Sequence, residues 1–181
     1  ISGFTTAGTT MLTGLDNMPT SVIVWRSLIQ WLGGLGVLLI VLIVGRAQGR
    51  STNSLLSAEG VKISSGRLSL NFAKAAVRFI QIYVVLTLLQ TILTTLLGMS
   101  LFDSFAHAMT TVATGGFSPH DESIAFYRNR PDIYPLYPAI EFVLSIFMLA
   151  GGTNFYVLYR LGKGQLAALW DGLEMRLLWL V

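Results

Sequence analysis

Two short segments of threonine and glycine carry the residues best suited to chemistry in this chain, and that chemistry is the coordination of a cation. The first segment reads TTAG at positions 5–8, and the second reads ATGG at positions 113–116. Glycine adopts left-handed backbone angles readily, and alternating such angles aims successive carbonyl oxygens at one axis. Carbonyl oxygens arranged in this way replace the water shell of a potassium ion. The threonine hydroxyls add oxygen atoms without adding charge.

Covalent catalysis and resident metal chemistry have few candidate residues. The chain has no cysteine and only two histidines, His107 and His120, which lie thirteen residues apart. This composition leaves no thiolate nucleophile and none of the common zinc ligand sets, so we expect no enzyme activity, no cofactor and no metal beyond a coordinated cation. The net charge of +3 comes from basic residues spread along the chain, so we expect no nucleic-acid partner either.

The composition places the chain in a lipid bilayer, because 53% of its 181 residues are hydrophobic and only 12% are charged. Three stretches lack any charged residue: 19 residues at 27–45, 24 at 79–102 and 18 at 142–159. A charge at the bilayer centre costs at least ~2.5 kcal/mol, so such gaps mark membrane segments. At about 1.5 Å per residue, each stretch approaches the ~30 Å of a hydrocarbon core. The sequence therefore predicts three transmembrane helices.

Basic residues set the orientation of these helices. Six cations oppose one anion at 45–78, and three cations oppose two anions at 160–176. The segment 98–138 has four acidic and two basic residues, and the first loop carries Asp16. Because cytoplasmic loops carry the excess of lysine and arginine, we place 45–78 and the stretch from 160 in the cytoplasm and the acidic segments outside.

The external segment contains a predicted half-helix. From Leu101 to Ala113 apolar residues recur at helical spacing, and Ser100 with Asp103 offers N-terminal caps. Such a helix is about 20 Å long, too short to cross a bilayer, and it leads directly into the second glycine loop. The first loop matches the second at an offset of 108 residues, and a proline and a span with a Gly-Gly pair follow each of them. We therefore predict two copies of one unit, the first of them incomplete.

The chain resembles the Trk/Ktr/HKT superfamily of potassium-uptake membrane proteins, relatives of potassium channels, in the motifs GFTTAGTT, RSLIQWLGGLGV, SLFDSFAHAMTTVATGGFSPHDES and FMLAGGTNFYVLYR. The resemblance implies an all-α integral membrane fold built from repeats of a helix, a re-entrant pore helix and loop, and a second helix. The family's pore subunit has four such units in one polypeptide. Ile1 stands in mid-motif, so we expect a piece of a longer chain.

The resemblance also divides the chain. Residues 1–44 correspond to the end of the first pore unit, with its filter loop and inner helix, and 45–78 to a cytoplasmic connection. Residues 79–161 correspond to a complete second unit, and 162–181 to a further cytoplasmic connection that could open a third unit. The family gate in the third unit and the membrane arginine of the fourth have no counterpart in this sequence.

The function and partners implied by the resemblance are those of a potassium pore. The filter would comprise Thr5, Thr6, Ala7, Gly8, Ala113, Thr114, Gly115 and Gly116. Gly8 and Gly116 take the place of the key glycines, and related plant proteins with serine at the first key position tend to favour sodium, so Gly8 favours potassium as the transported ion. The implied partners are the remaining pore units, a second copy in a homodimer, a cytosolic nucleotide-binding regulatory subunit and membrane lipid. The implied location is the bacterial inner membrane, crossed several times, with the filter loops on the external side.

Several residues keep two interpretations at this stage. Arg26 could hold a pore loop by hydrogen bonds or extend outward to the membrane surface. His107 is more typical of a hydrogen-bonded structural histidine than of a proton relay, and Asp103 more of a helix cap than of an ion ligand. The turn at 120–122 fits a solvated turn better than a cation-attracting mouth, and 151–154 fits close helix packing better than a gate.

Two alternatives to a potassium filter also stay open for the chain as a whole. One is a sodium-permeable member of the same family. The other is a non-conducting membrane scaffold or assembly subunit, in which Gly8→Ser or Gly116→Ser would alter stability but leave ion selectivity unchanged.

Overall fold

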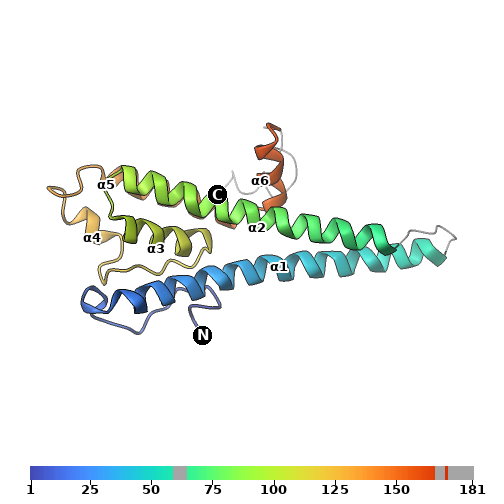
Figure 1. The fold of residues 1–181 in the computed structure, drawn as a ribbon, viewed down its shortest axis with the longest axis horizontal. Coiled ribbons are helices and arrows are strands. Elements are labelled where there is room, and N and C mark those ends of the chain that lie inside the picture. Colours follow the sequence, from blue (N-terminus) through green and yellow to red (C-terminus); the bar gives the residue numbers. More distant parts are fainter. Residues whose placement is uncertain (59–64, 166–169, 171–181) are drawn as a thin grey trace.

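The computed structural model describes residues 1–58, 65–165 and Trp170, and the regular elements in this part of the chain are all helices, joined by loops (Figure 1). Its elements follow in the order η1 (Leu15–Asn17), α1 (Thr20–Ala58), α2 (Ser65–Leu96), α3 (Leu101–Val112), α4 (Ala125–Arg128), α5 (Tyr137–Gly152) and α6 (Phe155–Gly162). The helices α1 and α2 run beside each other, and the shorter α3 lies between them at one end (Figure 1).

Two of the three predicted spans are present as long apolar helices. The segments Thr20–Ile40 of α1 and Ala73–Leu96 of α2 are long and apolar enough to cross a membrane. Threonine hydroxyls in α2 bond to carbonyls one turn earlier, as Thr87 does to Tyr83 at 2.9 Å. Such bonds satisfy polar groups inside an otherwise apolar helix.

Both helices extend well beyond their apolar segments into the region predicted as a cytoplasmic connection. Helix α1 continues to Ala58 and α2 begins at Ser65, so the described parts of 45–78 are helical. The remainder of that connection, 59–64, lies outside the described residues. Most of the second predicted connection, 166–169 and 171–181, also lies outside them, including the proposed opening of a third unit.

The prediction of a third continuous transmembrane helix at 142–159 is wrong. Helix α5 ends at Gly152, Thr153 has an extended ψ of 152°, and a separate helix α6 begins at Phe155. The physical reason is local, because two glycines weaken the helix and polar groups then cap its end. The Thr153 hydroxyl donates to the carbonyl of Leu149 at 2.7 Å, and the Thr153 N–H donates to Ala150 at 3.1 Å. Charge counting does not detect such a break.

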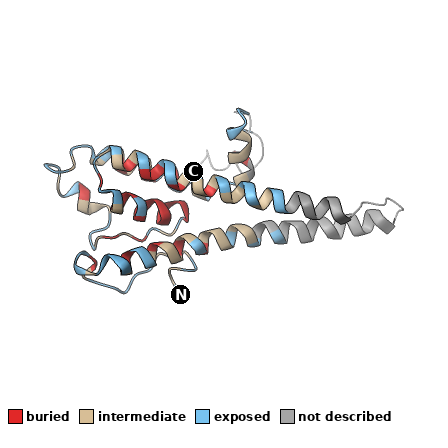
Figure 2. Cartoon of the chain, in the orientation of Figure 1, coloured by how far each residue is buried: buried red, intermediate tan, exposed pale blue. Residues whose placement is uncertain are grey.

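Helix α3 forms the packed centre of the described structure (Figure 2). Its side chains Ala106, Ala108, Met109 and Val112 are at most 3% exposed, whereas apolar side chains on the outer faces of the long helices are largely exposed. The Ser100 hydroxyl accepts the N–H of Asp103 at 3.0 Å and caps the first turn of the helix. The helix predicted at 101–113 is therefore confirmed, with its end at Val112. At about 18 Å for twelve residues it is too short to span a bilayer.

Candidate functional site

The two threonine-glycine segments have matching backbone conformations. Thr6 and Gly8 have positive φ angles of 55° and 72°, and Thr114 and Gly116, 108 residues later, have 54° and 77°. A left-handed conformation costs a residue with a side chain roughly 1–2 kcal/mol, so threonine adopts it rarely. Its occurrence at both equivalent threonines extends the predicted repeat to individual backbone angles.

Each loop uses its N–H groups for hydrogen bonds to the segment that precedes it. In the first loop, residues 5–7 donate to carbonyl oxygens of residues 1–3 at 3.0–3.1 Å. In the second loop, residues 114–116 donate to the carbonyls of Thr110 and Thr111, in the last turn of α3, at 2.8–3.2 Å. The N–H groups of residues 5–7 and 114–116 are therefore all bonded to the segment that precedes each loop.

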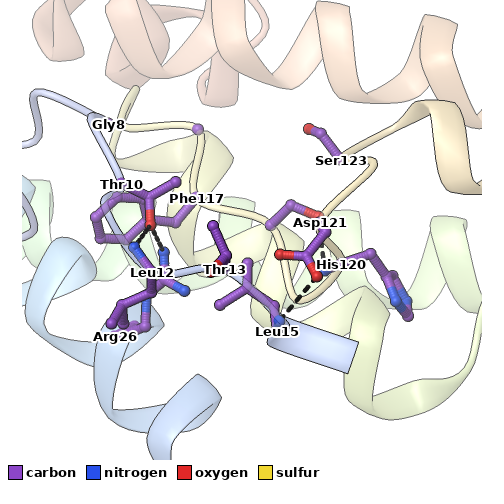
Figure 3. A pocket seen from close by; sticks show the side chains of 12 residues that line it. Gly8, Thr10, Leu12, Thr13, Leu15, Arg26, Phe117, His120, Asp121 and Ser123 are labelled. Atoms are coloured by element: carbon purple, nitrogen blue, oxygen red, sulfur yellow. Dashed lines mark hydrogen bonds between the residues drawn. The ribbon is translucent and has the colours of Figure 1, made fainter. Parts of the chain in front are cut away.

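The structure brings the two predicted loops into contact. A side-chain carbon placed on Gly8 would overlap the carbonyl oxygen of Gly115, so position 8 requires glycine for space as well as for its positive φ. The loops border a pocket of about 600 Å³ (Figure 3). The pocket is lined by Gly8, Thr10, Leu12, Thr13, Leu15, Arg26, Gly116, Phe117, Ser118, His120, Asp121 and Ser123.

Glycines in the flanking helices allow these loops to pack closely. A Cβ atom at Gly33 of α1 would overlap the carbonyl oxygen of Phe4, which precedes the first loop. A Cβ atom at Gly151 of α5 would lie 2.5 Å from the carbonyl oxygen of Val112, which precedes the second. The predicted packing role of the 151–154 segment is thus confirmed at Gly151.

Arg26 joins the chain beyond the first loop to the residue after the second. Its guanidinium donates to the hydroxyl of Thr10 at 2.8 Å and lies 4.6 Å from the ring centroid of Phe117 (Figure 3). Of the two interpretations of Arg26, the structure supports the one in which it holds the loop region by hydrogen bonds.

The turn at 120–122 is part of a contact between the two loop regions, which we call the outer clasp and define as Leu15, Asp16, Asp103, His120 and Asp121. His120 Nδ1 lies 2.5 Å from Asp16, and Nε2 lies 3.4 Å from Asp103. The Asp121 carboxylate accepts the N–H of Leu15 at 3.0 Å, and the Asp121 N–H donates to Asp16 at 3.4 Å. The turn is exposed at Asp121 and Glu122, as a solvated turn predicts, but its Asp121 carboxylate and His120 imidazole also bind the first loop.

Two further interpretations require correction. Asp103 does not cap its helix, because Ser100 does so and the Asp103 carboxylate faces His120 instead. His107 is 4% exposed and packs edge-on against the Tyr127 ring at 5.9 Å, but its Nε2 atom has no hydrogen-bond partner among the described residues. The expectation of a fully hydrogen-bonded histidine is not met at this atom.

We expect the outer clasp to weaken as the pH rises. Burial lowers the pKa of His120, but the neighbouring carboxylates of Asp103 and Asp16 outweigh it and the pKa lies above 6.5. The hydrogen bond with His120 lowers the pKa of Asp16 below 3.8. The contribution of His120 to folding stability is thus complete below pH 6.5 and is lost as the pH rises through its pKa in the folded protein. The contribution of Asp16 to folding stability is present above pH 3.8 and is lost as the pH falls below that value.

The expected size of this effect is below about 1 kcal/mol, because the pair is partly exposed and screened by solvent. The measurement is a thermal unfolding series in detergent from about pH 6 to about pH 9, comparing the parent with His120→Gln. The parent should lose stability over this range and the variant should not. Equal slopes for the two proteins would contradict the clasp.

Sequence reasoning missed two residues that hold the loops. Asp16 was noted only as an external charge, and its partner His120 is 104 positions away, so no local pattern connects them. Gln30 is completely buried in α1, and its Oε1 atom accepts the N–H of Phe117 at 3.1 Å. An uncharged polar residue within an apolar span was the signal that could have identified it.

Two helices that are long and apolar enough to cross a bilayer are typical of a membrane protein, and comparison with known proteins identifies the family. Residues 1–163 match the family model described as TrkH, cation transport protein. The chain therefore belongs to the TrkH family, as the resemblance predicted, and has an all-helical membrane fold.

The individual relatives agree with this assignment. The Trk system potassium uptake protein TrkH of Escherichia coli is 32% identical over 97% of this chain and 35% of its own length. The protein TrkI of Halomonas elongata is 33% identical over 93% of this chain and 33% of its own length. The crystal structure of the potassium transporter TrkH from Vibrio parahaemolyticus has a TM-score of 0.71 at 27% identity, over 97% of this chain and 33% of that one. The chain thus spans about a third of the length of these relatives.

Proposed function

We propose that this chain forms two adjacent walls of a potassium-selective filter within a larger potassium-uptake protein. Residues 1–44 supply the end of one pore unit and residues 79–161 supply a complete second unit. The observation that carries the proposal is the repeated left-handed pair at Thr6 and Gly8 and at Thr114 and Gly116. The ion would pass inward down its electrochemical gradient, without covalent chemistry and without a cofactor.

The direction of the carbonyl groups supports a filter. In a trans peptide the N–H and C=O groups point in opposite directions, and the described peptide bonds are trans. Because the N–H groups of residues 6–7 and 114–116 point back toward the preceding segments, the carbonyls of Thr5, Thr6 and residues 113–115 point the opposite way. Such carbonyls can replace the hydration shell of a cation. The C-terminal end of α3, with its partial negative charge, lies beside the second loop and favours a cation there.

The transported ion and the cellular location in this proposal are inferred from the relatives. Their names describe potassium uptake. Position 8 holds glycine and not the serine that the family resemblance associates with a preference for sodium. We extend to this chain a place in the bacterial inner membrane with the loops on the external side. The proposed partners are the remaining pore units, a second copy in a homodimer, membrane lipid and a cytosolic nucleotide-binding regulatory subunit.

The test is Gly116→Ser in the complete polypeptide that we propose contains this sequence. Gly116 has a φ of 77° and open space around its Cα, so serine adds no overlap but strains the left-handed backbone by roughly 1–2 kcal/mol. Potassium-over-sodium discrimination should therefore fall about tenfold, the factor that corresponds to 1.4 kcal/mol. The measurement is rubidium uptake with sodium competition in potassium-transport-deficient cells.

Gly164→Ser is the matched control. Gly164 is also exposed, has the same φ of 77° and has open space around it, but it lies after α6, away from the loops. Its substitution should carry the same backbone strain and leave discrimination at the parental level. If Gly116→Ser and Gly164→Ser both discriminate like the parent, the chain is a scaffold and not a filter. If the parent itself prefers sodium, the chain belongs to a sodium-permeable member of the family.

A further inference from the structure

We propose that Gln30 of α1 is a positioning residue for the second loop and thereby a determinant of ion discrimination, an inference that rests on the proposed filter function. Gln30 belongs to the helix of the first unit, whereas the loop at 113–116 belongs to the second. One unit would therefore hold the filter loop of the next.

The first argument is the contact itself. Gln30 is completely buried, and its Oε1 atom accepts the N–H of Phe117, the residue directly after Gly116, at 3.1 Å. The carbonyl of Phe117 accepts the hydroxyl of Thr110 at 2.7 Å. Both backbone polar groups of Phe117 are thus bonded to buried side chains, which fixes the end of the loop.

The second argument is the orientation of the amide. A backbone N–H can only donate, so the atom of Gln30 that faces Phe117 must be the oxygen. The amide nitrogen is then held beside Gly115, where an added Cβ atom would overlap the Gln30 side chain. That nitrogen is buried without a hydrogen-bond partner among the described residues, so Gln30 retains an unsatisfied donor at this position. An apolar side chain of the same size would fill this space equally well and would leave no donor unpaired. The acceptor of Gln30, and not its volume alone, therefore accounts for a glutamine at this position.

The third argument is the position of Gln30 on its helix. Residues three apart share a helix face, and Gly33 on the same face packs under Phe4, which precedes the first loop. One face of α1 therefore contacts both loops, at Phe4 through Gly33 and at Phe117 through Gln30. This face sets the spacing between the two proposed filter walls.

The experiment compares three variants of the complete polypeptide. Gln30→Met keeps the approximate volume but removes the acceptor, and Gln30→Glu keeps an acceptor at the same reach. Gln90→Met is the matched control, because Gln90 in α2 is also completely buried and its amide contacts no loop through a hydrogen bond. The readouts are the half-saturation concentration for rubidium, sodium competition, and hydrogen exchange of the Phe117 amide in detergent.

The expected result is specific to the acceptor. Gln30→Met should reach the membrane at parental abundance, lose potassium-over-sodium discrimination about tenfold and accelerate exchange of the Phe117 amide, since a buried N–H loses its partner. Gln30→Glu keeps the acceptor and should keep exchange of the Phe117 amide at the parental rate, and Gln90→Met should leave both discrimination and exchange unchanged. A merely structural role would lower abundance in both methionine variants and leave discrimination alone.

Two results would overturn the proposal: parental discrimination in Gln30→Met, or the same loss in Gln90→Met. If Gln30→Met does not accumulate, the same measurements are made on Gln30→Asn. This variant moves the acceptor away from Phe117 by one methylene group, so it should show the same loss of discrimination. A parent without potassium-over-sodium discrimination would overturn the filter itself. In that case, faster amide exchange in Gln30→Met alone would still establish that Gln30 holds the loop.

Discussion

Gly33→Ala is expected to lower both stability and ion uptake sharply, whereas Gly36→Ala, one turn further along α1, should be neutral or stabilising. Alanine favours a helix over glycine by about 1 kcal/mol at either position. At Gly33 the new methyl group would overlap the carbonyl oxygen of Phe4 and lie 3.1 Å from its Cα, both of them backbone atoms. At Gly36 an added Cβ atom would meet no described atom within 4 Å outside the adjoining turns of its own helix. The pair therefore separates helix propensity from packing against the first loop.

The overlap that Gly33→Ala creates cannot be removed by a small movement of a side chain. A flexible side chain could rotate away, but Phe4 can move only with the backbone that leads into Thr5, and overpacking of this kind costs about 1–3 kcal/mol or more. Uptake of rubidium per molecule in the membrane should fall at least about tenfold, the factor that corresponds to 1.4 kcal/mol. Thermal unfolding in detergent supplies the second readout. Equal behaviour of Gly33→Ala and Gly36→Ala would show that α1 does not support the first loop.

Local features of the fold could be predicted because local sequence determines them. The half-helix from Leu101, its cap at Ser100 and the two long apolar helices each follow from periodicity, capping chemistry or a gap in charge. The left-handed Gly8 and Gly116 follow from glycine's conformational freedom. These are properties of neighbouring residues, and such properties appear in the sequence itself.

The features that escaped prediction depend on distant residues or on context. Threonine at a positive φ, as at Thr6 and Thr114, contradicts its own preference and is imposed by the surrounding loop. Gln30 and Phe117 are 87 positions apart, so their hydrogen bond has no sequence signature without the fold. The break after Gly152 was missed for another reason, since it arises from helix-ending residues inside an uncharged stretch.

Gly151→Ala and Gly152→Ala make the second strong comparison, because two adjacent glycines at the end of α5 have different surroundings. A Cβ atom at Gly151 would lie 2.5 Å from the carbonyl oxygen of Val112 and 3.3 Å from its Cα. At Gly152 the nearest atom is the methyl carbon of Thr114 at 4.0 Å, an ordinary contact. Both substitutions replace glycine by alanine at the same helix end, so their difference reports the contact with Val112 alone.

We expect Gly151→Ala to destabilise the protein by about 1–3 kcal/mol through overpacking and to reduce discrimination between potassium and sodium. Val112 ends α3, so a displacement of its carbonyl moves the start of the second loop at Ala113. Gly152→Ala should retain parental discrimination and gain up to about 1 kcal/mol from helix propensity. Sodium competition of rubidium uptake and thermal unfolding measure the two effects. Loss of discrimination in Gly152→Ala alone would instead indicate that flexibility between α5 and α6, and not packing beneath the loop, controls the ion path.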